Sequence, residues 1–283
     1  MTSCKQRGTL WLVSTPIGNL KDITLRALDV LKSADIIVCE DTRVTRKLLQ
    51  AYTITPPQLW TYHEHNARVQ RPKIHEALWE GKTIALVSDA GTPLISDPGF
   101  KLVKECQEKG FPVTAAPGVS AVTTALSLSG LATNEFYFAG FVPRKSGGRQ
   151  RFFKSLSIVY GTLVFYESAR RVVATLKDMK PFFEGRDVAL ARELTKRFEE
   201  VKRCSLGDLI ADLDQRSSLK GEIVLLVGPP VFQEVSCEDL DTALNQAMAT
   251  KSLREAVSEI STVFGISRKK VYERALAHKS GEK

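Results

Sequence analysis

The stretch that most constrains this chain is a short apolar run followed by a long loop of small residues. Residues 84–87 read I-A-L-V, and residues 88–99 read S-D-A-G-T-P-L-I-S-D-P-G. A brief apolar run bounded by turn residues is typical of a strand buried on both faces of a parallel sheet. We therefore predict an α/β fold, in which ligands bind beyond the carboxyl ends of the strands.

The loop after this strand is longer and richer in small residues than a plain turn into a helix requires. A ligand can approach the backbone closely at Ala90 and Gly91, because their side chains occupy almost no space. Ser96, Asp97 and Pro98 are typical of a helix start, so the next helix is expected to begin there. The loop lacks both G-K-[ST] and G-x-G-x-x-G, so a phosphate is not the expected ligand. A ligand site is favoured over a structural turn.

The same switch from an apolar run to a polar loop recurs along the chain. Residues 9–13 are followed by S-T-P-I-G-N-L, residues 36–39 by E-D-T-R, and residues 112–116 by P-G-V-S-A. Because parallel strands end at one edge of their sheet, we expect these loops to share one cleft. Glu40 and Asp41 could equally open a helix, where acids interact favourably with the helix dipole.

A second set of strands and helices predicts a second α/β domain. Apolar runs over 136–141, 163–166, 188–192 and 223–227 are the expected strands. The basic, glycine-containing segment 143–151 is expected to be an exposed mobile loop. That loop is either a solvated connector or a contact for nucleic acid.

The C-terminal part differs in kind, with three short helices expected over 239–248, 252–264 and 267–278. Gly265 suits a helix C-terminus and Ser267 suits the cap of the next helix, as in a helix-turn-helix. The expected domains are therefore an N-terminal α/β domain, a C-terminal α/β domain and a small helical domain, over residues 1–117, 118–230 and 236–283.

Composition adds broad bounds. The 283 residues include five cysteines without a C-x-x-C pair, and the net charge is +8. A cytoplasmic protein with reduced thiols is expected, because no signal-peptide segment precedes the first strand. The positive charge weakly favours a polyanionic partner. His63 and His65 alternate on one expected strand, but a third ligand at suitable spacing is missing, so no metal is expected.

Five segments together resemble the tetrapyrrole methylase superfamily. They are V-S-T-P-I-G-N-L-K-D-I-T-L-R-A-L, C-E-D-T-R, S-D-A-G-T-P-L-I-S-D-P-G, A-A-P-G-V-S-A and F-Y-E-S-A-R-R. Within the superfamily they are most similar to the branch that methylates the 2′-oxygen of a cytidine ribose in the decoding region of 16S ribosomal RNA. The resemblance extends over residues 9–229, and the helical part is also similar to that branch. The alternative is a small-molecule methyltransferase of the precorrin type, which methylates carbon.

The resemblance implies a homodimer that binds S-adenosylmethionine in a cleft between two α/β domains. The cofactor-binding residues it implies are Pro16, Asp89, Ala90, Gly91, Thr92, Pro93, Ser120, Ala121, Tyr166, Leu194, Gly221 and Glu222. The implied partner is 16S ribosomal RNA, within the small ribosomal subunit.

Methyl transfer to a ribose hydroxyl also needs a group that accepts the hydroxyl proton or stabilises the oxygen anion. The candidates at strand ends are Glu40, Asp41, Arg43, Glu167 and Lys196. Residues expected to contact RNA lie in the basic segment and the last helix, and are Arg144, Lys145, Arg149, Arg151, Arg268, Lys269, Lys270 and Arg274.

Overall fold

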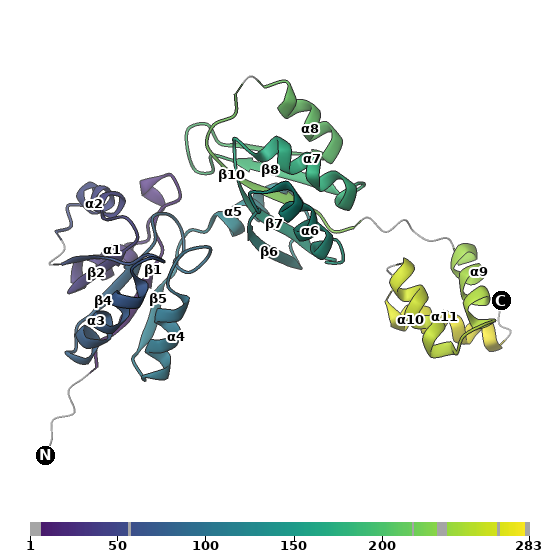
Figure 1. The fold of residues 1–283 in the computed structure, drawn as a ribbon, viewed down its shortest axis with the longest axis horizontal. Coiled ribbons are helices and arrows are strands. Elements are labelled where there is room, and N and C mark those ends of the chain that lie inside the picture. The colour runs from purple at the N-terminus through teal and green to yellow at the C-terminus, as the bar shows by residue number, and fades with distance from the viewer. Residues whose placement is uncertain (1–6, 56–57, 217, 231–236, 265–266, 281–283) are drawn as a thin grey trace, which may run out of the picture. The chain divides into compact units, whose positions relative to one another are not determined.

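The computed structural model describes residues 7–55, 58–216, 218–230, 237–264 and 267–280. The chain forms two compact units, Met1–Pro229 and Pro230–Lys283. The first holds two five-stranded sheets and the second consists of helices (Figure 1). The expected α/β class with a helical C-terminal part is confirmed. The predicted domain 1–117 and all but the last residue of the predicted domain 118–230 lie in the first unit, and the division between them stays a prediction.

The first sheet is entirely parallel, with strand order β3-β2-β4-β1-β5. Its strands are β1 (Leu10–Val13), β2 (Ile36–Cys39), β3 (Leu59–Thr61), β4 (Ile84–Val87) and β5 (Val113–Ala116). All four residues of β2 and all four of β4 are buried, as expected for central strands covered on both faces. The carboxyl ends of the five strands therefore meet at one edge.

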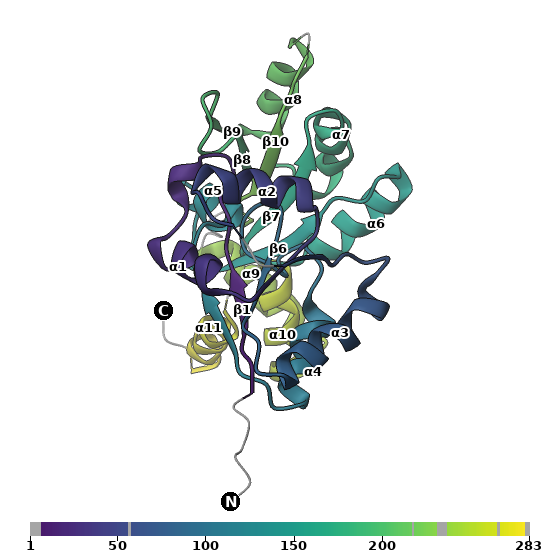
Figure 2. The ribbon, with the colours of Figure 1, turned by 90° about the vertical axis from the view of Figure 1, so that its left-hand side faces the viewer.

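Helices cover both faces of this sheet (Figure 2). They are α1 (Leu25–Ser33), α2 (Thr42–Ala51), α3 (Ala67–Trp79) and α4 (Phe100–Glu108), with a short 3₁₀ helix, η1 (Leu20–Asp22), before α1. Alternation along β2 separates the layers: Ile36 and Val38 pack with α3 and α4, whereas Ile37 and Cys39 pack with α1 and α2.

The second sheet is mixed, with strand order β6-β7-β10-β8-β9. Its strands are β6 (Phe136–Phe141), β7 (Thr162–Ser168), β8 (Asp187–Arg192), β9 (Glu200–Ser205) and β10 (Glu222–Val227). Strand β10 runs antiparallel to both β7 and β8, so Glu222 at its start lies beside Ser168 at the end of β7. One edge of the sheet thus collects the ends of β7 and β8 and the start of β10.

The two faces of the second sheet differ in their covering. One face packs against α6 (Ser146–Leu156), α7 (Val172–Phe183) and α8 (Leu206–Asp214), with the large aromatic side chains of Phe153, Phe165 and Phe183 in that core. The opposite face packs against α5 (Ala121–Ser129) and also against Ile17 and Leu194 from loops. The second face therefore borders the strand-end loops of the first sheet.

Two sequence predictions about these elements are wrong, and one strand was not predicted. Helix α4 begins at Phe100, not at Ser96–Pro98, because Gly99 adopts φ 140°, which turns the chain into the helix only after Pro98. Strand β7 extends through Ser168, so Glu167 lies inside the strand and not beyond its end. Strand β9 was not expected, because its polar sequence E-V-K-R-C-S carries no apolar run.

The prediction of a mobile loop at 143–151 is also wrong, because α6 begins at Ser146. The buried guanidinium of Arg149 is the physical reason. It bonds to Asp178 of α7 through both Nε (2.7 Å) and Nη2 (2.6 Å), and its Nη1 donates to the carbonyl of Arg144. These bonds fix the start of α6 against α7.

The helical unit contains α9 (Cys237–Met248), α10 (Leu253–Phe264) and α11 (Arg268–Ser280). Leu244, Val257, Ile260 and Val271 form its small core. Ser267 caps α11 by accepting the amide of Lys270, whereas the expected C-terminal glycine, Gly265, lies outside the described residues. Across the described ranges, every helix is too short or too polar to cross a membrane.

We predict that Asp178→Ala destabilises the α/β unit strongly. Removal of one partner leaves the Arg149 charge buried and unpaired, which typically costs about 3–5 kcal/mol. The neighbouring pair Lys177–Asp214 is about half exposed, so Lys177→Ala should change the free energy of unfolding by roughly 1 kcal/mol or less. Urea denaturation of both variants checks this, and equal midpoints would contradict the structural role of Arg149.

Candidate active site

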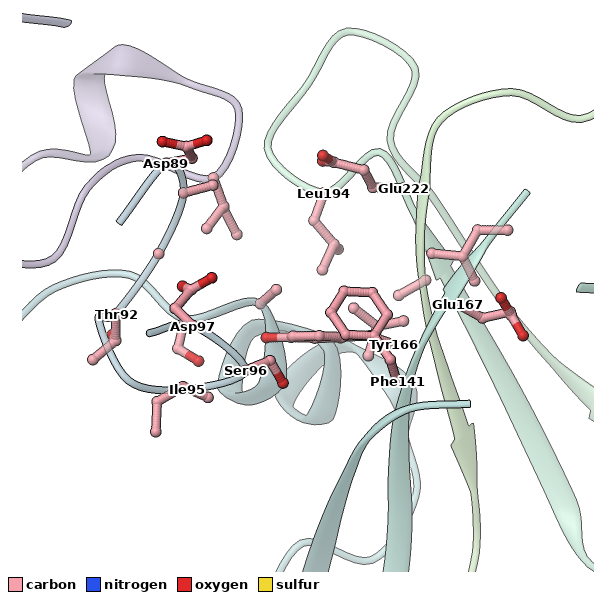
Figure 3. A pocket seen from close by; sticks show the side chains of 18 of the residues that line it. Asp89, Thr92, Ile95, Ser96, Asp97, Phe141, Tyr166, Glu167, Leu194 and Glu222 are labelled. Carbon is pink, nitrogen blue, oxygen red and sulfur yellow. The ribbon is translucent and has the colours of Figure 1, made fainter. Parts of the chain in front are cut away.

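The α/β unit contains a cavity of about 340 Å³ at the strand ends of both sheets (Figure 3). From the first sheet and its loops come Ile17, Glu40, Asp89, Ala90, Gly91, Thr92, Ile95, Ser96 and Asp97. From α5 and the second sheet come Ser120, Ala121, Phe141, Tyr166, Glu167, Ala191, Leu194, Glu222, Ile223 and Val224. The shared cleft expected from the strand-end loops is therefore present.

Hydrogen bonds hold the loops after β1, β4 and β5 together at this cavity. Thr15 and Gly91 exchange two backbone hydrogen bonds of 2.9 Å, and the Thr15 hydroxyl donates to the carbonyl of Ser88. The Thr92 hydroxyl lies 3.1 Å from the hydroxyl of Ser14 and 3.2 Å from the carbonyl of Val119. The three loops thus form one connected wall.

The loop after β4 is held in an unusual backbone conformation. Leu94 and Ser96 have φ of 72° and 66°, values that non-glycine residues rarely adopt, and Gly91 has φ 81°. Such strain concentrates at functional sites, where the surrounding structure maintains it. Here it directs Ser96 and Asp97 into the cavity.

The second sheet supplies the opposite wall. Tyr166 comes from β7, Leu194 from the turn between β8 and β9, and Glu222 from the start of β10. Figure 3 shows the phenol of Tyr166 extending across the cavity towards Asp97. Burial raises the pKa of this phenol to about 12, with a smaller contribution from the charge of Asp97. Tyr166 therefore keeps its proton at neutral pH and can donate a hydrogen bond.

Three carboxylates of the first wall face the same cavity, namely Glu40, Asp89 and Asp97. Burial, and then the charge of Glu40, raises the pKa of Asp97 to about 6. Burial is also the main cause of the raised pKa values of Glu40 and Asp89. The charge of Asp89 adds to the rise for Glu40, and the charge of Asp41 adds to the rise for Asp89. A cluster of like charges in a half-buried cavity favours a cationic ligand.

Asp97 and Phe141 line the cavity but were not among the predicted site residues. Asp97 was missed because Ser-Asp-Pro also has the composition of a helix start. Its position as the last carboxylate of the long loop was the available signal.

Four of the predicted catalytic candidates have partners that occupy their charged groups. Arg43 bonds to Asp41, whose side chain also caps α2, and these hydrogen bonds lower the pKa of Asp41 to about 2. Lys196 bridges Glu193 and Glu222 at 2.9 Å each. The alternative interpretation of the E-D-T-R segment was that its acids begin a helix, and Asp41 does so as the cap of α2.

Glu167 is the fourth catalytic candidate whose charged group has partners, and its side chain is fully buried. Its carboxylate accepts from Thr175 (2.6 Å) and from the amide of Ser168 (2.6 Å), and it pairs with Arg171 (2.6 Å). In Figure 3 its side chain points away from the cavity. Among the five predicted catalytic candidates, only Glu40 has both a place in the lining and no ion-pair partner within the described residues.

Most of the predicted cofactor residues lie in the lining, and three do not: Pro16, Pro93 and Gly221. Ile17 lines the cavity in place of Pro16. A glycine is required at position 221 for structural reasons, because a Cβ there would lie 2.5 Å from the side chain of Glu193.

The predicted RNA contacts are dispersed. Arg144, Lys145 and Arg151 are exposed around the start of α6, whereas Arg149 is buried in its pair with Asp178. Arg149 is thus unavailable to a ligand at the surface. The described part of the chain contains no group of three or more His, Cys, Asp or Glu side chains suited to a metal ion.

Two family models match the chain. The model described as Tetrapyrrole (Corrin/Porphyrin) Methylases matches residues 9–210, and the model described as the RsmI C-terminal HTH domain matches residues 234–279. Among solved structures, cobalt precorrin-4 methyltransferase superposes with a TM-score of 0.57 at 17% identity, covering 78% of this chain and 94% of that one. Uroporphyrin-III C-methyltransferase from Thermus thermophilus, in complex with S-adenosyl homocysteine, gives 0.53 at 20% identity, covering 77% and 97%. At these identities the superpositions establish the fold.

Sequence relatives are much closer. A protein of Mesorhizobium japonicum named ribosomal RNA small subunit methyltransferase I is 45% identical over 96% of this chain and 94% of its own length. The protein of the same name from Escherichia coli O157:H7 is 42% identical over 95% of both chains. At this identity and coverage, the chain belongs to the tetrapyrrole methylases and, within them, to the family of ribosomal RNA small subunit methyltransferase I.

Proposed function

We propose that the protein transfers a methyl group from S-adenosylmethionine to the 2′-oxygen of a cytidine ribose in the decoding region of 16S ribosomal RNA. The main support for a ribosomal RNA substrate is the 45% identity, over 96% of the chain, to a relative named ribosomal RNA small subunit methyltransferase I. The choice of a cytidine ribose rests on the sequence motifs of this branch. A homodimer in the cytoplasm that acts on the small subunit remains part of the proposal.

The residues of the cavity fit S-adenosylmethionine. Its sulfonium and ammonium groups are positive, and the carboxylates of Glu40, Asp89 and Asp97 provide negative charge nearby. Apolar side chains such as Leu194 and Val224 line the second wall and suit the nucleoside part. When bound, the sulfonium supplies an electrophilic methyl group, and the protein's contribution is to align the ribose oxygen with it.

We assign Asp97 as the acceptor for the ribose proton. A general base works best when its pKa is near the operating pH, and the pKa of Asp97 is raised to about 6 by burial and by Glu40. The neutral phenol of Tyr166 extends towards Asp97 and can orient the ribose by a hydrogen bond. Methylation of a tetrapyrrole carbon is not favoured, because the likeness to the precorrin enzymes extends to the fold alone.

The first test concerns the close approach of the ligand to Gly91. Gly91→Val should weaken S-adenosylmethionine binding at least ten-fold, which corresponds to about 1.4 kcal/mol, because a side chain there strains the backbone and fills the cavity wall. Isothermal titration calorimetry measures the affinity.

Gly185→Val is the matched control for that test. Gly185 has nearly the same φ, 82°, but nothing lies within 4 Å of a Cβ built there. This variant carries the same backbone strain and should bind S-adenosylmethionine normally. Unchanged affinity in a folded Gly91→Val protein would remove Gly91 from the site.

The second test concerns the proton acceptor. Asp97 accepts a proton only when deprotonated, so the rate should rise with pH through an apparent pKa of about 6. Asp97→Asn should lower kcat about 100-fold, the usual scale for loss of a general base, and should abolish this acidic limb. Glu40→Gln should keep the limb, shifted to lower pH, because one repulsive charge is removed. A limb that survives in Asp97→Asn would contradict the assignment.

The third test concerns the product. Mass spectrometry of nuclease-digested 16S ribosomal RNA from cells that lack the protein should reveal the loss of one methyl group from a cytidine ribose. Re-expression of the wild type should restore it, whereas Asp97→Asn should not. If the lost methyl group were on a base, the ribose assignment would be wrong.

A further inference from the structure

A second cavity, of about 360 Å³, is lined by residues of α10 and α11 in the helical unit. These two helices pack against each other (Figure 1). Its lining comes from Arg254, Val257, Ser258, Arg268, Lys269 and Tyr272. Val257 is buried and forms the floor, and the basic side chains and Tyr272 are exposed around it. The cavity thus combines three cations, the phenol ring of Tyr272 and the hydroxyl of Ser258.

The helical geometry brings these side chains together. Residues four apart lie on one face of a helix, as Arg254 and Ser258 do on α10 and Arg268 and Tyr272 do on α11. A hydrogen bond of 2.9 Å from Arg268 Nη2 to Ser258 Oγ joins the two faces. This bond uses one of the five guanidinium N–H donors and holds the group at the cavity.

The positive charge of this cavity is local. Residues 231–283 contain eight Lys or Arg and eight Asp or Glu, so this part of the chain has no net charge, and the +8 belongs to residues 1–230. Elsewhere on the unit, Arg274 pairs with Asp241 and Lys251 with Glu259. Within the described residues, no ion pair forms at Arg254, Arg268 or Lys269.

We propose that this cavity binds one nucleotide of single-stranded RNA. Arg254, Arg268 and Lys269 would hold its phosphate, and the base would stack on the exposed ring of Tyr272. Cations beside an aromatic side chain are the combination that binds single strands, since phosphates need charge and every base offers a face for stacking. The inference rests on the proposed ribosomal RNA substrate and deepens it by locating a contact remote in sequence from the methyl-transfer cavity.

The proposal also separates the basic residues of α11. Lys270 follows Lys269 directly and is also exposed, but it does not line the cavity. Arg274 is held by two hydrogen bonds to Asp241 of α9. Of the four cations predicted from the sequence to contact RNA in this helix, Arg268 and Lys269 are therefore the ones assigned to this nucleotide.

The test compares neighbouring lysines in the full-length protein. Fluorescence anisotropy with a short, labelled single-stranded RNA, without S-adenosylmethionine, gives the affinity at several KCl concentrations. Lys269→Gln should weaken binding and reduce the slope of log affinity against log salt by about 0.7, the value for one contact to a single strand. Lys270→Gln should leave both nearly unchanged. Equal effects of the two substitutions would overturn the proposal.

Tyr272 provides the second arm. Tyr272→Ala should weaken RNA binding about five-fold or more, whereas Tyr272→Phe should retain it, because stacking needs the ring and not the hydroxyl. Circular dichroism confirms that both variants keep their helices. Equal affinity of the Ala and Phe variants would overturn the stacking assignment. Displacement of the RNA by a polyglutamate peptide, lost in Lys269→Gln, would assign the cavity to an acidic protein instead.

These outcomes are distinct from those of the proposed function. Suppose that the product is the expected ribose methylation but that Lys269→Gln and Lys270→Gln bind RNA equally well. That result overturns the RNA-binding role of this cavity and leaves the proposed reaction intact. Selective loss of RNA binding in Lys269→Gln, with the methyl group still present in cells that lack the protein, overturns the proposed reaction and keeps the RNA site.

Discussion

The paired backbone hydrogen bonds between Thr15 and Gly91 are the constraint on which the candidate active site depends. They join the loop after β1 to the loop after β4, just beyond two adjacent parallel strands. Gly91 can take its φ of 81° without strain, so the pairing costs little there. With this pairing in place, the long loop can hold Leu94 and Ser96 in strained conformations and present Asp97 to the cavity.

Glu40, Asp89 and Asp97 are a second consequence of this arrangement. In isolation the three carboxylates repel one another, and partial burial adds to the cost of their ionisation. A fold selected for stability alone would not gather them. Their proximity is physically sensible if a cation binds in the cavity, because its charge then offsets the repulsion between the carboxylates.

Much of this architecture could be predicted from the sequence, because the apolar strands and their small-residue loops are local patterns. The exceptions depend on distant contacts. Two glycines near its start make α6 a poor helix, and its position is fixed by the Arg149–Asp178 pair across to α7. Strand β9 lacks an apolar pattern and forms by pairing with β8. Asp97 had the pattern of an acid in the first turn of a helix, and its interaction with Glu40 depends on the fold.

The charge distribution along the chain has a kinetic consequence. Attraction between a protein and a polyanion acts at a distance through net charge, which here belongs entirely to residues 1–230. The helical unit is neutral as a whole, so its cations act only within about 8 Å, the screening length at physiological salt. In the function that we propose, the α/β unit would govern how fast RNA is captured, and the α10–α11 cavity would govern how long a captured strand stays.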